Sequence, residues 1–389
     1  MRVAIIGGGI GGLTAAIALR NAGIEAVVYE QAQQLGEVGA GIGVAPNGLR
    51  VYERLGLRDA IESVAARYGD GSVYYRADGT LIGEMTTSDS SGRYFTLGLH
   101  RADFVGVLTS ALPEGVVRTG HRLIGLEEGE EGVVLEFASG VTETADLVVG
   151  ADGIHSVVRA AVTEPTQPVA SGSIAYRGLV RADRLRSWTP GIAQLWMGEG
   201  KHFLTYPVRS GELINYVGFV PSGERLRESW SAPGNVEALR ADFAGWDDRV
   251  EGLLEEVEQT FWWGLYDREP LQRWSTDRVT LLGDAAHAML PHLGQGANQA
   301  IEDAMTLAVL LGAAAASSAP EALGEYERLR LDRTTRVQSG ARDNGLRYDS
   351  GYEDLRQRDD EIKNSKTFRR WLYDYDAEAV ARERVLTVD

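Results

Sequence analysis

The chain has 389 residues, of which 44% are hydrophobic and 24% are charged, proportions typical of a globular protein. Its net charge of −17 disfavours binding to the phosphates of nucleic acids and to anionic membrane surfaces. The complete absence of cysteine excludes disulfides, thiolate catalysis and zinc–thiolate sites. We therefore expect a cytoplasmic protein with no nucleic acid, membrane or metal partner.

The first thirty residues combine a strand pattern, a glycine turn and a helix pattern. An apolar run at 2–6 precedes a helix-like stretch that extends to Ala22. Between them stand three glycines in G-x-G-x-x-G spacing: Gly7, Gly9 and Gly12. Such glycines allow a sharp turn, close approach of the backbone to a pyrophosphate, and close packing of helix on strand. A second apolar run ends at Glu30, where a carboxylate can accept ribose hydroxyls, so the segment predicts a site for an ADP-containing cofactor.

Two later segments, 146–161 and 278–311, again pair an apolar run with a glycine turn, as strand-turn-helix units do. The section between them alternates apolar and polar residues and is rich in aromatics, which is typical of antiparallel strands. The order predicts an α/β fold with a discontinuous dinucleotide-binding domain, an inserted β-rich domain and a C-terminal segment of surface helices. Their expected boundaries are 1–165 with 276–320, 166–275, and 321–389. The apolar stretch 304–316 is shorter than the roughly twenty residues of a membrane span, so we interpret it as a buried core helix.

The turns of the two later segments carry acidic residues and further glycines. The residues concerned are Asp152, Gly153, Gly283, Asp284, Pro291, Gly294, Gly296 and Asn298. With three fingerprints in this order, the chain resembles the FAD-dependent aromatic-ring monooxygenases. These are the single-component flavoprotein hydroxylases, such as para-hydroxybenzoate, salicylate, 3-hydroxybenzoate and 6-hydroxynicotinate hydroxylases. The resemblance extends from Arg2 to about Leu311 and returns weakly at 371–373.

The resemblance implies a bound FAD in a Rossmann-like fold of the para-hydroxybenzoate hydroxylase type. Asp284, directly after Gly283, would hold a ribityl hydroxyl, and Asp152 with Gly153 would lie near the pyrophosphate and NAD(P)H. Each carboxylate could instead simply cap the turn that follows it. Arg101 matches the family's arginine on the cofactor, although an ordinary surface arginine is the alternative.

The glycine loop after Pro291 would lie against the isoalloxazine ring. In the family, the proline borders the position where oxygen reacts. The backbone N–H groups of Gly294, Gly296 and Asn298 would face the ring. A helix that we expect to begin near Gln299 would stabilise negative charge on the reduced flavin with its positive end.

The substrate side is predicted from a strand-like segment that contains His202 and Tyr206. Because side chains alternate along a strand, residues four apart share one face of the sheet. The segment resembles the H-x-x-x-Y-P stretch of hydroxybenzoate and hydroxynicotinate hydroxylases, whose histidine and tyrosine approach the phenolic oxygen of the substrate. Packing in the core is the alternative for both. Arg177 is either a partner for a substrate carboxylate or structural, and we expect His287 and His292 to pack or orient other groups.

The resemblance implies that NAD(P)H reduces FAD, that oxygen adds to carbon 4a of the flavin, and that the hydroperoxide hydroxylates a phenolic or hydroxylated heteroaromatic ring. Gly43 stands where hydroxynicotinate hydroxylases have a histidine, and Pro291 stands where 3-hydroxybenzoate hydroxylases have a glutamine, so the substrate stays open. The sequence also leaves the choice between NADH and NADPH open. The alternatives are a non-phenolic substrate, such as a polyketide, purine or terpenoid, and a flavin-binding sensor without turnover. We expect a monomer or homodimer.

Overall fold

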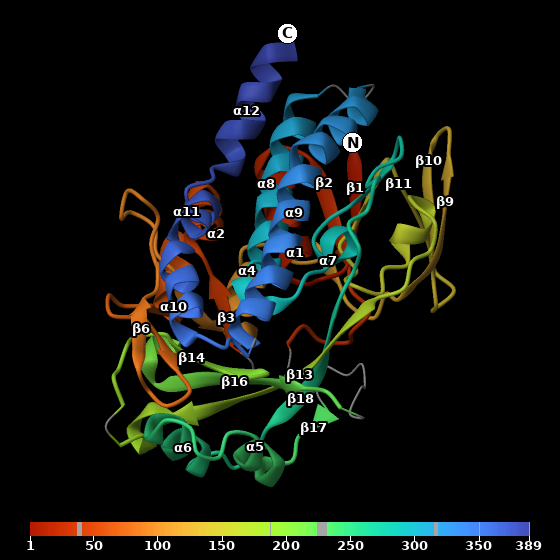
Figure 1. The fold of residues 1–389 in the computed structure, drawn as a ribbon. Coiled ribbons are helices and arrows are strands. Elements are labelled where there is room, and N and C mark those ends of the chain that lie inside the picture. Colours follow the sequence, from red (N-terminus) through yellow and green to blue (C-terminus); the bar gives the residue numbers. More distant parts are fainter. Residues whose placement is uncertain (37–40, 187, 224–231, 315–317, 350, 389) are drawn as a thin grey trace.

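The computed structural model describes residues 1–36, 41–186, 188–223, 232–314, 318–349 and 351–388. Two large β-sheets organise the chain. A parallel sheet with its helices forms the upper half in Figure 1, and an antiparallel sheet with two short helices beneath it forms the lower half. The predicted α/β fold with an antiparallel β-rich part and C-terminal helices is confirmed.

The parallel sheet has the strand order β19-β12-β1-β2-β8, and all neighbouring pairs in it are parallel. Its strands are β1 (Arg2–Ile6), β2 (Glu25–Tyr29), β8 (Val117–Arg118), β12 (Leu147–Gly150) and β19 (Val279–Leu281). Because the strands are parallel, the glycine turns after β1, β12 and β19 meet at one edge of the sheet.

The second strand-turn-helix unit was predicted incorrectly in one respect. After β12 the chain forms only the short 3-10 turn η1 (Val158–Ala161) in place of a helix. The guanidinium of Arg159 donates to the carbonyl oxygens of Gly153 and Ile154, at 3.3 and 3.0 Å. The carbonyl oxygen of Gly153 also accepts from the backbone N–H of Ser156, at 3.0 Å, so the turn is held by a backbone bond as well as by the side chain of Arg159.

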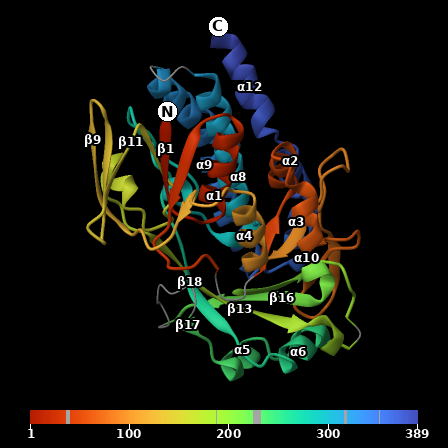
Figure 2. The same cartoon turned by 180° about the vertical axis from the view of Figure 1, so that it is seen from behind.

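Helix α1 (Ile10–Asn21) follows the first turn and packs against α8 (Gly296–Ala313), as Figure 2 shows from behind. Helix α8 contains the described part of the predicted core helix, and most of its side chains are buried. It begins at Gly296, before the expected Gln299. Gly294 has a φ of +64°, which directs the chain into this earlier start.

The antiparallel half is an eight-stranded sheet of order β17-β18-β13-β16-β15-β14-β5-β6, in which β14 and β5 pair in parallel and the other neighbours pair antiparallel. Its strands are β5 (Val73–Arg76), β6 (Leu81–Glu84), β13 (Val169–Arg181), β14 (Gln194–Gly198), β15 (Lys201–Val208), β16 (Leu213–Pro221), β17 (Ala232–Pro233) and β18 (Phe261–Asp267). Strand β13 pairs with β16 on one side and with β18 on the other. Strands β5 and β6 come from outside 166–275, so this sheet crosses the predicted domain boundaries. The boundaries themselves stay a prediction.

The C-terminal segment is helical but not confined to the surface. It contains α9 (Ala319–Asp349), α10 (Leu355–Asn364), α11 (Lys366–Tyr373) and α12 (Ala377–Val388). Helix α9 runs from the upper half down to the antiparallel sheet in Figure 1. Its Arg330 is fully buried and binds Glu302 and Asp303 of α8, with N–O distances of 2.6 Å to each. A charged helix can be buried in this way because its charges have buried partners.

Smaller elements complete the described chain. A three-stranded sheet contains β3 (Gly41–Val44), β4 (Ala65–Arg67) and β7 (Leu97–His100), and another contains β9 (Leu123–Gly129), β10 (Gly132–Phe137) and β11 (Thr142–Ala145). The other elements are α2 (Pro46–Arg54), α3 (Arg58–Val64), α4 (Arg101–Ser110), α5 (Val236–Asp242), α6 (Asp248–Glu255), α7 (Asp284–His287), η2 (Ala182–Arg184), η3 (Arg209–Gly211) and η4 (Pro291–Leu293). None of the helices described is both long and apolar enough to cross a bilayer.

Candidate active site

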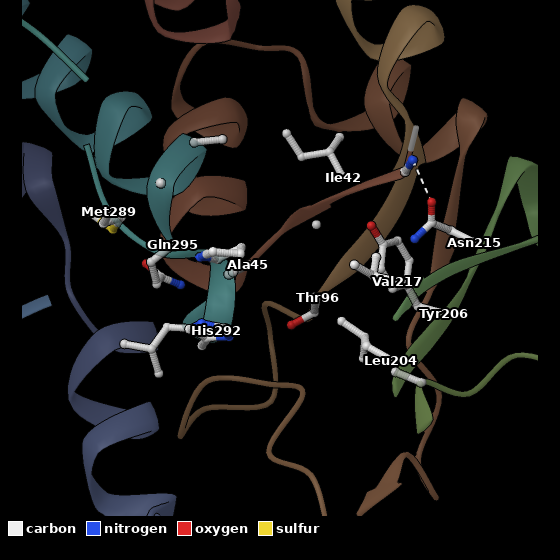
Figure 3. Close-up of a pocket in the computed structure, with 18 of the residues that line it drawn as sticks. Ile42, Ala45, Thr96, Leu204, Tyr206, Asn215, Val217, Met289, His292 and Gln295 are labelled. Carbon is white, nitrogen blue, oxygen red and sulfur yellow. Dashed lines mark hydrogen bonds between the residues drawn. The ribbon is translucent and has the colours of Figure 1, made fainter. Parts of the chain in front are cut away.

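A cavity of about 450 Å³ lies between the turns of the parallel sheet and the wall of the antiparallel sheet. Figure 3 shows His292 and Gln295 on one side of it and Leu204, Tyr206 and Val217 on the other. Of the predicted site residues, those that line the cavity are Gly9, Arg101, Gly153, His202, Tyr206, Gly283, Asp284, Pro291, Gly294 and Gly296. Those that lie outside its lining are Gly7, Gly12, Glu30, Asp152 and Asn298.

The glycines of the first turn have two different geometries. A Cβ on Gly7 would lie 2.3 Å from the carbonyl oxygen of Ala151, and one on Gly12 would lie 2.0 Å from the carbonyl oxygen of Gly7. These two glycines let β1, β12 and α1 pack closely. A Cβ on Gly9, in contrast, would meet no atom within 4 Å, and Gly9 lines the cavity. The space that a ligand's pyrophosphate needs at the start of α1 is therefore open.

Glu30 stands at the end of β2, beside this turn. Its two carboxylate oxygens accept hydrogen bonds from the backbone N–H groups of Gly8 and Ala32, at 2.7 and 2.8 Å. These bonds fix the carboxylate at the edge of the sheet. A carboxylate has about four acceptor positions, so capacity remains for ribose hydroxyls.

Asp284 has the geometry of a ligand-binding carboxylate. It lines the cavity and its side chain makes no hydrogen bond to any residue that the structure describes. Burial raises the pKa of this carboxyl group above its ordinary value. Hydroxyl groups of a polyol would supply the donors that this partly buried carboxylate lacks.

Asp152 has the geometry of a cap. Its carboxylate accepts hydrogen bonds from the hydroxyl of Ser156 at 2.5 Å and from the N–H groups of Val157 and Val158 at 2.7 and 3.2 Å. Burial raises the pKa of Asp152. Its neighbour Gly153, with a φ of +80° and open space at its Cβ position, lines the cavity instead.

Arg159 was not identified from the sequence. Its guanidinium binds the carbonyl oxygens of Asp284 and Ala285 as well as those of the second turn, at 3.2 and 2.8 Å. It thereby ties together two turns that are far apart in the chain. A single arginine after an apolar run gave no local signal of this role.

The loop after Pro291 is held by a side chain rather than by backbone bonds alone. The side-chain oxygen of Asn298 accepts from the N–H of Ala45, and its amide donates to the carbonyl oxygens of Gly43 and Gly294. The amide therefore fixes the loop against β3. Next to it, Gln295 leaves its buried side-chain nitrogen without a partner among the described residues and lines the cavity.

The opposite wall brings His202 and Tyr206 together on one face of β15, as their spacing predicts. The Nδ1 atom of His202 lies 2.6 Å from the Oδ1 atom of Asp349, the last residue of α9. The imidazole stacks on Phe219 at a centroid distance of 4.0 Å. Burial holds the pKa of the neighbouring His292 well below its usual range, so that ring is neutral.

The C-terminal helices supply wall residues that the sequence analysis missed. Tyr348 of α9 and Arg369 and Tyr373 of α11 line the cavity. Their only signal in the sequence was the weak return of the resemblance at 371–373. His287, by contrast, is buried against Asp303 at 2.6 Å, which fits the packing role expected of it.

These residues fit a long cofactor with an anionic middle and a polyol segment. Gly9 and Gly153 leave room for a pyrophosphate, the carboxylate of Asp284 awaits donors, and the loop at Gly294 leaves open space beside the cavity. Comparison with known proteins identifies the class. Residues 1–341 match the family described as an FAD binding domain, and the chain belongs to it. The protein is an FAD-dependent aromatic monooxygenase.

Individual relatives are named for related reactions. The chain is 42% identical to a 3-amino-4-hydroxybenzoate 2-monooxygenase of Streptomyces platensis, over 97% of each chain. It is 37% identical to a salicylate hydroxylase of Pseudomonas putida, over 90% of this chain and 86% of the relative. A solved salicylate hydroxylase substrate complex is 32% identical, with a TM-score of 0.85 over 98% of this chain and 97% of that one.

Proposed function

We propose that this enzyme uses NADH or NADPH and oxygen to hydroxylate a phenolic ring, with His202 as the group that accepts the phenolic proton. The observation that carries the proposal is the 2.6 Å contact between Nδ1 of His202 and Asp349 in the cavity wall. Relatives named for aminohydroxybenzoate, salicylate and hydroxynicotinate support the substrate class, since each of these rings bears a hydroxyl group.

The carboxylate of Asp349 selects one tautomer of His202. A carboxylate is an acceptor, so it favours the tautomer in which Nδ1 carries the proton. Nε2 is then the acceptor nitrogen of a ring that lines the cavity. Asp349 is itself held in place, because its backbone oxygen accepts a hydrogen bond from Gly200 at 2.6 Å.

When bound, FAD supplies the redox chemistry, which is reduction by NAD(P)H, activation of oxygen and transfer of one oxygen atom to the ring. The ring must be electron-rich, so a phenolate reacts far better than a phenol. A phenol has a pKa of about 10, and lowering it by two units in the site requires about 2.7 kcal/mol of preferential stabilisation of the phenolate. Proton transfer to His202, with Tyr206 on the same wall, is a way to supply it.

The same proposal covers the cofactor-binding side. Gly7, Gly9, Gly12 and Glu30 would hold the ADP portion, and Asp284 would hold the ribityl chain. Arg101 and Gly153 would hold the middle of FAD, and Asp152 would cap the turn that carries Gly153. The ring would lie against Pro291 and the loop that contains Gly294, Gly296 and Asn298. The neutral His292 and the amide of Gln295, whose nitrogen has no partner among the described residues, add no negative charge that would oppose a reduced ring.

The direct test is consumption of NADH and NADPH by the FAD-loaded enzyme with 3-amino-4-hydroxybenzoate, salicylate and 6-hydroxynicotinate, with products identified by mass. Uric acid belongs in the same screen, because a solved FAD enzyme from Klebsiella pneumoniae complexed with uric acid is 28% identical, over 100% of this chain and 96% of that one, with a TM-score of 0.80. A flavin-binding sensor would show no stimulation by any aromatic compound. Substrate-stimulated oxidation with a hydroxylated product is the expected result.

His202→Ala tests the residue assignment. Loss of a proton acceptor typically slows the step by about 10²- to 10⁴-fold, so hydroxylation should slow within this range while FAD binding stays unchanged. His121→Ala is the control, since His121 lies outside the cavity lining. Normal coupled turnover of phenols by His202→Ala would return this histidine to a packing role.

We also propose that the enzyme acts in the cytoplasm as a monomer or homodimer and does not bind nucleic acid. The net charge of −17 supports the last statement. Light scattering of the purified protein, with and without duplex DNA, measures both the assembly state and the binding.

A further inference from the structure

Arg369 is a cation in the cavity wall that has hydroxyl partners but no carboxylate partner. It belongs to α11 and lines the cavity. Its guanidinium donates to the Oη atoms of Tyr373 and Tyr348, both at 3.3 Å. Over the part of the chain that the structure describes, Arg369 forms no ion pair with an Asp or Glu. A third tyrosine, Tyr74, is close enough to interact electrostatically with it.

Arg369 is partly buried, and it differs from three buried arginines that have carboxylate partners. Arg330 and Arg333 both pair with the carboxylate of Glu302, and Arg50 pairs with Asp89 at 3.1 Å. Buried cations generally need such a partner, because removing a charge from water is costly. Among the described residues, the guanidinium of Arg369 donates to two neutral oxygen atoms, although it has five N–H donors. An anionic group on a bound molecule would supply the missing charge.

We propose that Arg369 binds the carboxylate of an aromatic acid substrate. The inference rests on the proposed function and deepens it by naming the second polar group of the substrate. A planar guanidinium matches a carboxylate through two parallel hydrogen bonds, which gives orientation as well as affinity. The two tyrosine hydroxyls hold the guanidinium in place for this contact.

Tyr348 places this subsite next to the proposed proton acceptor. The centroid of its ring lies 5.2 Å from the centroid of the His202 imidazole, while its hydroxyl accepts a hydrogen bond from Arg369. A ring with its hydroxyl at His202 and its carboxylate at Arg369 would therefore lie beside Tyr348. Apolar side chains that line the same cavity, among them Met85, Leu195 and Leu204, would contact the ring between them.

Arg177 is the competing candidate for the carboxylate. It also lines the cavity, but its guanidinium lies over the ring of Trp263, with its carbon 4.8 Å from the ring centroid. A phosphate of FAD is a poorer candidate for Arg369. The pyrophosphate site is at the start of α1, whereas the contacts of Arg369 are with tyrosines of β5, α9 and α11.

The experiment compares an acid with its uncharged amide on the FAD-loaded enzyme. Dissociation constants for salicylate and salicylamide are measured from the change in flavin absorbance. Truncating one partner of a buried charge pair costs enough to weaken binding by about 30-fold or more. We expect the wild-type enzyme to prefer salicylate, and Arg369→Met to weaken salicylate by about 30-fold or more while salicylamide changes less than about threefold.

Arg370→Met is the matched control, because Arg370 is the next residue on α11 and its side chain is exposed. It should bind both compounds like the wild type. Arg369→Lys, which keeps the charge but loses the planar fork, should fall between wild type and Arg369→Met. FAD content and reduction by NAD(P)H without substrate verify that each variant is folded.

Two results would overturn the proposal. One is a wild-type enzyme that binds and hydroxylates phenols lacking a carboxylate equally as well as it binds and hydroxylates the acids. This result can be obtained without any variant. The other is an Arg369→Met enzyme that keeps full affinity for the acid, especially if Arg177→Met loses it. Both differ from failure of the proposed function, in which no phenol of either kind would be hydroxylated.

Discussion

The two sides of the cavity are built in different ways. The cofactor side consists mainly of backbone, with glycines at the ends of parallel strands and a few side chains that hold the turns. The substrate side consists of side chains on β15, α9 and α11, which meet only after the chain has folded. The cofactor side therefore depends on the absence of Cβ atoms at its glycines. The substrate side depends on the functional groups of its side chains. Substitutions on the two sides should therefore have different effects on stability, cofactor affinity and hydroxylation.

The largest effect is expected at the buried ion network that connects the two sides. Arg330 of α9 binds Glu302 and Asp303 of α8, the helix that follows the cofactor loop. Arg330→Met would leave two buried carboxylates with less compensation and should lower the free energy of unfolding by about 3–5 kcal/mol. Urea denaturation measures this. Arg328→Met removes an exposed pair with Glu325 on the same helix and should cost less than about 1 kcal/mol.

The same network predicts how stability depends on pH. Burial acts to raise the pKa of Glu302, but Arg333 and Arg330 outweigh it and hold that pKa below its ordinary value of 4.5. Because the folded pKa is lowered, the stabilisation is fully present above the unfolded pKa and is lost as pH falls through the folded value. Wild-type protein should therefore lose stability on acidification below about pH 4.5. If Arg330→Met loses less stability on acidification than the wild type, the pH dependence arises from this network. If the two lose the same amount, it arises from other groups.

The next effect compares two glycines of one turn. Gly12→Ala would place a Cβ 2.0 Å from the carbonyl oxygen of Gly7, so it should destabilise even the cofactor-free protein, by about 1–3 kcal/mol or more. Gly9→Ala meets no protein atom within 4 Å, so it should leave the cofactor-free protein intact. Its methyl group would occupy the space proposed for the pyrophosphate and should weaken FAD at least about tenfold, about 1.4 kcal/mol. Thermal unfolding and FAD titration measure both quantities.

This pair also tests the division between the two sides. Unchanged FAD affinity in Gly9→Ala would mean that the open space at the start of α1 is not the cofactor path. Normal stability of Gly12→Ala would mean that the helix can move away from β1 without cost.

The same contrast explains what the sequence could predict. Strand, glycine turn and following acid are neighbours in the chain, so the turns after β1 and β19 were predicted from local spacing. The alternation of His202 and Tyr206 on one strand was also local. The contact of His202 with Asp349 joins residues 147 positions apart, and no periodicity reports such a contact.

The errors have the same physical origin. A helix rich in arginine was predicted at the surface, because the sequence does not show that Arg330 has buried carboxylate partners on α8. A helix was expected after β12, but the chain forms a short turn there, which Arg159 connects to distant carbonyl oxygens of Asp284 and Ala285. The pairing of β5 with β14 was missed because it joins distant segments in parallel. Local patterns predict elements, and long-range partners decide their neighbours.

The smallest effect that distinguishes the two sides is expected at Asp349, a positioning residue. Asp349→Asn offers an amide that can donate to Nδ1 of His202, which would place the proton on Nε2 and remove the acceptor. Hydroxylation should slow about 10- to 100-fold, by analogy with the carboxylates that orient metal-binding histidines. FAD affinity should not change. Asp343→Asn, at an exposed position of the same helix, is the control.

A role in proton transfer, as distinct from packing, gives Asp349→Asn a specific signature. The defect should be large for a phenol that must lose its proton in the site and small for a fluorinated analogue that is already ionised at the assay pH. If Asp349 only anchored α9 against β15, both substrates would slow equally, and salicylate affinity would fall with them. A defect that disappears with the ionised analogue ties the carboxylate of α9 to the chemistry of the ring.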